Sequence, residues 1–128
     1  MEYREIELSF DKRVATVCFN REASLNSFSR ELKEECIDAF NSLAYDDRVG
    51  AIVVTGKGKH FCAGGNIVEL KENIDSGKYI PPETAWLTIE WVRAIRRCLK
   101  PVIAMVNGAA MGGGAAIASA CDYRFMEP

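Results

Sequence analysis

Hydrophobic and polar residues alternate at the start of the chain, as they do in a strand with one buried face. Ile6, Leu8 and Phe10 are separated by polar residues. After a short polar turn, the segment from Val14 to Phe19 is again apolar and rich in β-branched side chains. The pattern predicts a β-hairpin at the N-terminus of the chain.

Later segments carry the periodicity or the composition of helices. Apolar side chains recur every three or four positions from Arg30 to Tyr45 and again from Thr84 to Leu99. A shorter helix rich in alanine is expected over Gly113 to Cys121, and Ile67 to Asn73 is compatible with another. The segment Ile74 to Glu83 contains one glycine and two prolines, so we expect it to be irregular.

Two short segments between these helices are continuously apolar. Ala51 to Thr55 and Val102 to Val106 have the β-branched composition of strands that are buried on both faces. Asp122 to Met126 is expected to begin a further strand. A hairpin followed by strands that alternate with helices predicts an α/β fold with a mixed sheet and crossover helices.

Composition narrows the class of protein. Hydrophobic residues make up 48% of the 128 residues and the net charge is −2, which is typical of one soluble globular domain without a nucleic acid partner. No apolar run approaches the ~20 residues that cross a membrane, and no signal region is seen. Five scattered cysteines without a Cys-x-x-Cys pair argue against disulfides and against a metal site. We therefore expect a cytoplasmic protein.

Two glycine-rich stretches each follow a predicted buried strand. Asn107 to Ala116 contains three consecutive glycines, and Cys62 to Gly65 contains two. A helix that begins after such glycines presents free backbone N–H groups, which bind negative charge. If the fold brings the two turns together, two N–H groups can point at one oxygen and form an oxyanion hole.

Other glycine-dependent sites are excluded by spacing. Lys57 is followed by Gly58 rather than by Ser or Thr, so there is no phosphate-binding Walker A loop. The glycines at 112–114 lack the G-x-G-x-x-G spacing of dinucleotide-binding folds. A nucleotide site is therefore not predicted.

Several side chains could carry chemistry but also have a structural explanation. The only histidine, His60, is interpreted as an exposed loop residue or a partner of the backbone rather than as an acid or base. Cys62 is interpreted as a small packing residue under a tight turn rather than as a nucleophile. A basic patch is either a solvated helix end or a contact for phosphate or a partner; it comprises Arg93, Arg96, Arg97 and Lys100.

Four motifs occur in order along the chain: Asn26 within Ala-Ser-Leu-Asn-Ser, Thr-Gly-Lys-Gly-Lys-His-Phe-Cys-Ala-Gly-Gly-Asn-Ile, Lys-Pro-Val-Ile-Ala-Met-Val-Asn-Gly-Ala-Ala-Met-Gly-Gly-Gly, and Cys-Asp-Tyr-Arg. With these motifs the whole chain resembles the enoyl-CoA hydratase/isomerase (crotonase) superfamily. The resemblance implies a ClpP/crotonase-type spiral of ββα units. Residues 1–128 would be the N-terminal part of an acyl-CoA-binding domain, truncated before the C-terminal helices.

The resemblance also implies a site. The backbone N–H groups of Gly65 and Gly113 would form the oxyanion hole for a CoA thioester. The adenosine and pantetheine of CoA would lie near a second group of residues, which comprises Ala23, Leu25, Ala63, Asn66 and Ile67. CoA enters as part of the substrate, so no separate cofactor and no metal is implied. The full-length protein would assemble as a homotrimer or hexamer.

One position departs from the hydratases of the family. They carry a glutamate two residues after the third glycine, where this chain has Ala116, and their second glutamate would lie downstream of Pro128. A methyl group is neither acid nor base, so isomerase or other one-base chemistry is favoured over two-glutamate hydration. The alternatives are a non-catalytic acyl-CoA-binding or assembly module and, less favoured by the acidic net charge, RNA binding through the basic patch.

Overall fold

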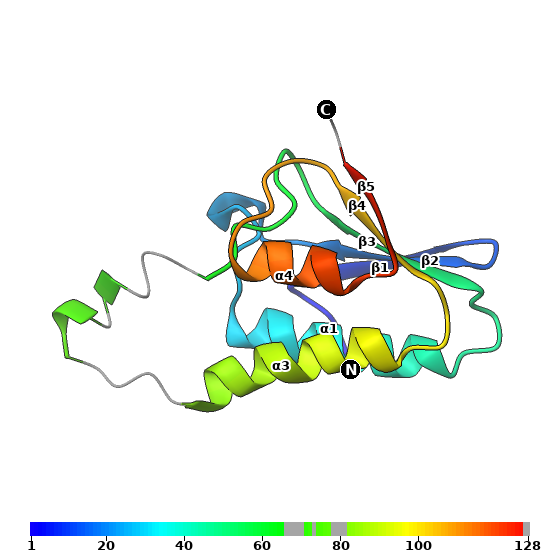
Figure 1. Ribbon diagram of the computed structural model, residues 1–128, viewed down its shortest axis with the longest axis horizontal. Helices are drawn as coiled ribbons and strands as arrows, with labels where there is room; N and C mark the ends of the chain where they lie inside the picture. Colours follow the sequence, from blue (N-terminus) through cyan, green and yellow to red (C-terminus); the bar gives the residue numbers. More distant parts are fainter. Residues whose placement is uncertain (66–70, 73, 78–81, 127–128) are drawn as a thin grey trace.

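The computed structural model describes residues 1–65, 71–72, 74–77 and 82–126, and its centre is a five-stranded sheet (Figure 1). The strands are adjacent in sequence order. β1 and β2 form the predicted antiparallel hairpin, and the later strands are parallel to β2. The strands are β1 (Ile6–Asp11), β2 (Val14–Phe19), β3 (Ala51–Gly56), β4 (Val102–Val106) and β5 (Tyr123–Met126).

Each pair of neighbouring parallel strands is joined through a helix, as parallel pairing requires. The helices α1, α3 and α4 lie on the same side of the sheet, with α1 and α3 next to each other (Figure 1). A short 3-10 helix, η1, precedes α1. The bounds are η1 (Glu22–Ser24), α1 (Arg30–Ala44), α3 (Pro82–Arg97) and α4 (Gly113–Ala120).

The sequence predicts the five strands and the helices α1, α3 and α4 to within two residues at each end, whereas η1 is not predicted. The largest shift is at α3, which begins at Pro82 rather than at Thr84. Proline is favoured in the first turn of a helix, where its missing N–H would have no partner. The prediction of an irregular segment from Ile74 to Glu83 is therefore wrong for its last two residues, and it is also wrong for residues 74–75, which are helical. The predicted helix Ile67 to Asn73 lies mostly outside the described residues.

Polar contacts hold both ends of α1. The Ser29 hydroxyl accepts a hydrogen bond from the Leu32 N–H at 3.0 Å, which caps the N-terminus. Lys100 Nζ donates to the carbonyls of Leu43, at 2.8 Å, and Asp46 at the other end. Lys100 thus binds carbonyls at and just beyond the C-terminal end of α1 and ties this helix to the chain entering β4.

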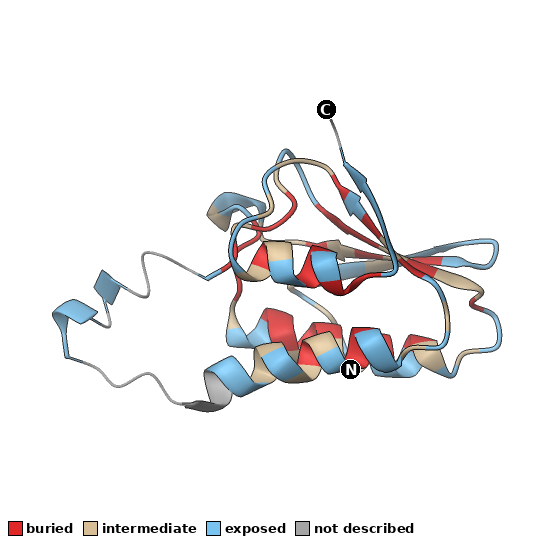
Figure 2. Ribbon diagram, viewed as in Figure 1, coloured by how far each residue is buried: buried red, intermediate tan, exposed pale blue. Residues whose placement is uncertain are grey.

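The core fills the space between the sheet and the helices (Figure 2). Trp91 of α3 is fully buried there, with its ring packed edge-on against Phe19 at 5.7 Å and against Phe28 at 5.1 Å between centroids. Alternate residues of the strands face this core, including Ala15 and Val17 of β2 and Ile52 and Val54 of β3.

The opposite face of the sheet has no such cover among the described residues. Val53 of β3 is only partly buried, and Met105 of β4 is 47% exposed. In the β4–β5 register Met105 pairs with Phe125, which is 66% exposed. The prediction that both strands are buried on both faces is therefore wrong for β4 at Met105, whereas the outward residues of β3 are partly buried or, at Thr55, buried. The described helices α1, α3 and α4 lie on the other side of the sheet.

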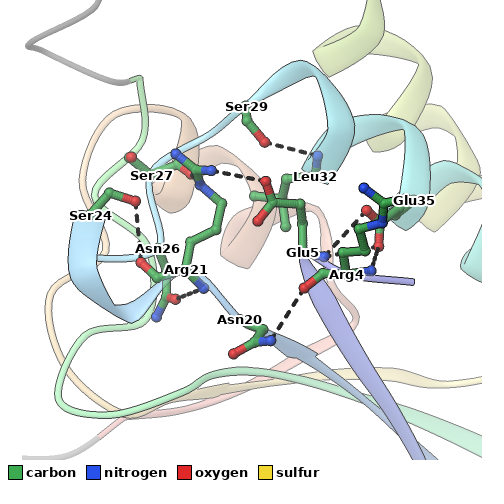
Figure 3. A network of polar contacts seen from close by, with 10 residues as sticks. All are labelled: Arg4, Glu5, Asn20, Arg21, Ser24, Asn26, Ser27, Ser29, Leu32 and Glu35. Atoms are coloured by element: carbon green, nitrogen blue, oxygen red, sulfur yellow. Dashed lines mark hydrogen bonds and ion pairs between the residues drawn. The ribbon is translucent and has the colours of Figure 1, made fainter. Parts of the chain in front are cut away.

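Glu35 of α1 fastens the chain that enters β1 (Figure 3). Its side chain is 2% exposed and accepts hydrogen bonds from the N–H groups of Arg4, at 2.7 Å, and Glu5, at 3.1 Å. The Glu5 carboxylate in turn pairs with Arg21 at 3.0 Å. These contacts connect the first strand, α1 and the segment before η1.

Replacing Glu35 with alanine should lower the free energy of unfolding, because it leaves backbone N–H groups without a partner at about 1–3 kcal/mol each. Urea denaturation measures the change. The matched control is Glu34→Ala on the same helix, which loses only an exposed ion pair with Arg30 and should change stability by less than about 0.5 kcal/mol. Equal losses in the two variants would contradict the role of Glu35.

Candidate functional site

The two glycine turns lie side by side, which is the condition that the oxyanion-hole hypothesis requires. Cys62 forms an isolated parallel bridge with Ala110. The Cys62 N–H donates to the Ala109 carbonyl at 3.1 Å, and the Met111 N–H donates to the Cys62 carbonyl at 3.0 Å. The loop after β3 and the loop after β4 are therefore paired through their backbones just before α4 begins.

This pairing requires glycine at the points of closest approach. Gly64 has a φ of 83°, and a Cβ there would lie 2.6 Å from the Met111 carbonyl oxygen and 3.1 Å from the Gly113 nitrogen. A Cβ at Gly113 would overlap Cε2 of Phe28. A side chain at Gly64 would therefore push the turns apart, and one at Gly113 would collide with the Phe28 ring.

The two proposed donors, the N–H groups of Gly65 and Gly113, share the lack of a hydrogen-bond acceptor in the described chain. Gly113 is the first residue of α4, and its N–H has no intrahelical partner because of that position. Within the described part of the chain, the N–H groups of Gly65 and Gly113 donate no hydrogen bond. Both groups are available for a ligand oxygen, and the N-terminal end of α4 favours negative charge there.

Two asparagine side chains fix the loop that follows β3. Asn107, at the end of β4, accepts from the Gly56 N–H at 3.2 Å and donates to the carbonyls of Gly56, at 2.6 Å, and Gly58, at 2.9 Å. Asn26 is fully buried and donates to the carbonyls of Lys57, at 3.1 Å, and His60, at 2.8 Å.

The sequence patterns indicate no structural role for either asparagine. Asn26 also accepts from the Arg21 N–H at 2.9 Å, and it has a φ of 56°, which asparagine adopts more readily than most residues (Figure 3). An asparagine beside a turn is the signal that points to a side chain that holds a loop through hydrogen bonds. Its partners could not be inferred, because they lie 31 and 34 residues away.

Cys62 behaves as a packing residue. Its side chain is fully buried, donates to the Asn26 carbonyl at 3.0 Å and accepts from the Gly64 N–H at 3.4 Å. Burial raises the pKa of the Cys62 thiol to about 11. The thiol is therefore protonated at neutral pH and is no activated nucleophile. Among the described residues, the His60 ring has no hydrogen-bond partner.

The residues expected near CoA are only partly described. Leu25 is 47% exposed, and its carbonyl accepts from the Ala63 N–H at 3.0 Å, so these two residues are adjacent. Ala23 is exposed on η1, two residues before Leu25. Asn66 and Ile67 lie outside the described residues. Binding of CoA by this group stays a prediction.

Every member of the basic patch has a partner within the chain. Arg93 pairs with Glu90 at 2.8 Å, and Arg97 lies 4.0 Å from the same carboxylate. Arg96 donates to the Ala120 carbonyl at 3.3 Å, at the end of α4, and Lys100 binds the end of α1. These contacts favour the structural interpretation of the patch over a phosphate or partner contact.

The described ranges hold neither a metal-binding cluster nor a membrane-spanning helix. They contain no group of three or more His, Cys, Asp or Glu residues that could hold a metal ion. Nor do they contain a helix that is long and apolar enough to cross a membrane.

Comparison with known proteins identifies the class. Residues 9–128 match the family model for enoyl-CoA hydratase/isomerase, so the chain belongs to this family. A probable enoyl-CoA hydratase of Mycobacterium tuberculosis strain H37Rv is 35% identical over 128 residues, which cover 99% of this chain and 48% of the relative. The chain thus spans about half the length of the curated relatives that it matches.

Solved structures agree with this assignment. An enoyl-CoA hydratase of Bacillus anthracis aligns with a TM-score of 0.81 and 27% identity, over 94% of this chain and 46% of that one. A monofunctional enoyl-CoA isomerase of Mycobacterium smegmatis aligns with a TM-score of 0.77 and 30% identity, over 95% and 49%. The fold is therefore the crotonase fold, as predicted, over about half the length of these neighbours.

The raised pKa predicts the reactivity of Cys62. At pH 8 a thiol with a pKa of about 11 is ionised to only about one part in a thousand. In the native protein, iodoacetamide should label the partly exposed Cys98 well before Cys62, with mass spectrometry of peptides as the measurement. In urea the two rates should converge. Equal rates in the native state would show that Cys62 is accessible and activated.

Proposed function

We propose that this chain binds an acyl-CoA thioester and stabilises its enolate with the backbone N–H groups of Gly65 and Gly113. The observation that carries the proposal is the backbone pairing of the two glycine turns, with Gly113 at the first position of α4. When a proton leaves the carbon next to the thioester carbonyl, the oxygen becomes negatively charged. Fixed N–H donors at that oxygen lower the barrier because they need no reorganisation.

The proposed chemistry uses one base, in an isomerase or a related enzyme. Ala116 is exposed on α4, three residues after Gly113, so the first turn of this helix offers a methyl group where the hydratases carry a carboxylate. Hydration needs groups that position water and transfer protons, whereas shifting a double bond needs a base that moves one proton across the enolate. The base itself is not assigned to a described residue.

The absence of an acid or base at Cys62 and Ala116 favours a second candidate, a non-catalytic acyl-CoA-binding or assembly module. Cys62 is held as a protonated thiol, and Ala116 supplies no acid or base. Calorimetry with an acyl-CoA, combined with a turnover assay, separates the two candidates. Binding with turnover supports the enzyme, binding alone supports the module, and absence of binding contradicts both.

The remaining parts of the proposal follow from the family. Ala23, Leu25 and Ala63 would contact the adenosine and pantetheine of CoA, together with Asn66 and Ile67. CoA would enter as part of the substrate, without a separate cofactor. Assembly as a homotrimer or hexamer and a cytoplasmic location also belong to the proposal.

Proline and alanine at position 65 provide a matched test of the donor. A Cβ at Gly65 meets no described atom within 4 Å, so alanine adds a side chain but keeps the N–H, whereas proline removes it. The proline variant should be about 10²- to 10³-fold slower than the alanine variant. The carbonyl stretch of bound ¹³C-labelled acyl-CoA, measured by infrared difference spectroscopy, should shift towards its position in water. Equal rates and equal spectra would exclude Gly65 as a donor.

Ala116→Glu tests the assignment of the reaction. If the chain lacks only the first carboxylate of a hydratase, the variant should gain enoyl-CoA hydration, measured by loss of the conjugated thioester absorbance. The one-base proposal instead expects no gain in hydration, with isomerisation reduced or unchanged. Ser119→Glu, at an exposed position one turn further along α4, is the control for added charge on this helix.

A further inference from the structure

Phe28 lies between η1 and α1, outside both glycine turns, and its backbone contacts one of them. Its N–H donates to the Gly64 carbonyl at 2.6 Å, and it forms an isolated parallel bridge with Gly65. The Gly64 carbonyl and the Gly65 N–H belong to the same peptide unit. Because a trans peptide is planar and places its oxygen and hydrogen on opposite sides, this hydrogen bond directs the Gly65 N–H away from Phe28.

The same hydrogen bond polarises the Gly64–Gly65 peptide. A carbonyl that accepts a hydrogen bond draws electron density from its own N–H, so the Gly65 N–H becomes a better donor. The backbone of Phe28 therefore affects both the direction and the strength of one proposed donor.

The side chain of Phe28 contacts the other turn. Its ring packs against Gly113 so closely that a Cβ there would overlap Cε2. The ring is 7% exposed and packs edge-on against Trp91 at 5.1 Å, with Lys33 Nζ 5.6 Å from its centroid. Since the ring is enclosed on these sides, it forms a fixed wall for the first residue of α4.

We infer that Phe28 is a positioning residue for the oxyanion hole, orienting the Gly65 N–H through its backbone and placing Gly113 through its ring. This inference rests on the proposed function of those two groups. A smaller side chain at position 28 lets the first turn of α4 move relative to Gly65. The N–H groups remain but no longer meet the same oxygen, so the change affects enolate formation more than binding of CoA.

Phe28 is also a core residue, and the experiment has to separate the two roles. Phe19 provides the matched control, because it is fully buried and packs edge-on against the same Trp91. Phe19 also packs against Phe61, which precedes the first glycine turn, at 5.3 Å between ring centroids, but it is not among the nearest atoms around the glycines of either turn. Phe28→Leu and Phe19→Leu therefore remove the same ring from the same core, but only the first also removes the wall behind Gly113.

The two variants are compared in thermal stability, in dissociation constant for acyl-CoA, in kcat and KM, and in the carbonyl stretch of bound ¹³C-labelled acyl-CoA. Both should lose stability. Phe28→Leu should lower kcat by about 10²-fold, because a displacement of catalytic groups by about 1 Å can have an effect of this size. Its dissociation constant for acyl-CoA should stay within a few-fold of that of the unmodified chain. Its carbonyl stretch should move towards the position in water, whereas Phe19→Leu should leave both kcat and the spectrum near those of the unmodified chain.

A second comparison tests the contact itself. Gly113→Ala introduces the Cβ that overlaps the ring, and Phe28→Leu makes room for it. The fold reduction of kcat in the double variant should therefore be smaller than the product of the two single reductions. Its shift of the carbonyl stretch should likewise be smaller than the sum of the two single shifts. Independent effects would mean that the ring does not set the position of Gly113.

The outcomes distinguish this inference from the proposed function. If Phe28→Leu and Phe19→Leu behave alike in the spectrum and in kcat, Phe28 is a core residue only and the inference is wrong. If Gly65→Pro leaves the carbonyl stretch of the bound thioester unchanged, the oxyanion assignment itself fails. The spectrum serves as the readout where turnover is too slow to measure.

Discussion

The backbone contact between the loops after β3 and β4 is the constraint on which the rest of the site depends. It exists only where side chains are absent: a Cβ at Gly108 would overlap the Lys59 carbonyl, and one at Gly114 would overlap the Cys62 carbonyl. With those positions open, the two loops pair through their amides and α4 begins directly beside Gly64. The end of a helix and a second turn thus meet at one place without any side chain between them.

The sequence allowed the elements of this arrangement to be predicted, but not the contacts that hold them. Periodicity and composition located the strands and the helices α1, α3 and α4, and glycine clusters located the turns, because these signals are local. The contacts that hold the loops are not local. Asn107 forms a hydrogen bond with Gly56 from 51 residues away, and the ring of Phe28 packs against Gly113 across an even longer stretch of chain. No pattern of polar and apolar residues contains such pairings, so they required the structure.

The outer face of the sheet shows a different limit of sequence patterns. Continuous apolar residues in β3 and β4 predict cover on both faces, since parallel strands of this composition are normally enclosed. The described helices cover one face, and Met105 and Phe125 form part of an apolar row on the other. The pattern correctly identified apolar surfaces on both sides. It could not specify which part of a protein, if any, packs on each of them.

The proposed donors are backbone groups, whereas any base has to be a side chain, and this separates the two parts of the proposed chemistry. Backbone N–H groups do not titrate in the range where side chains do, and their position depends on Gly64, Gly113 and Phe28 rather than on the residue at 116. Ala116 lies on the exposed side of α4, and the backbone pairing of the turns does not involve its side chain. Under the proposed function, the backbone donors to an enolate could stay in place while the reaction changes with the side chains around them.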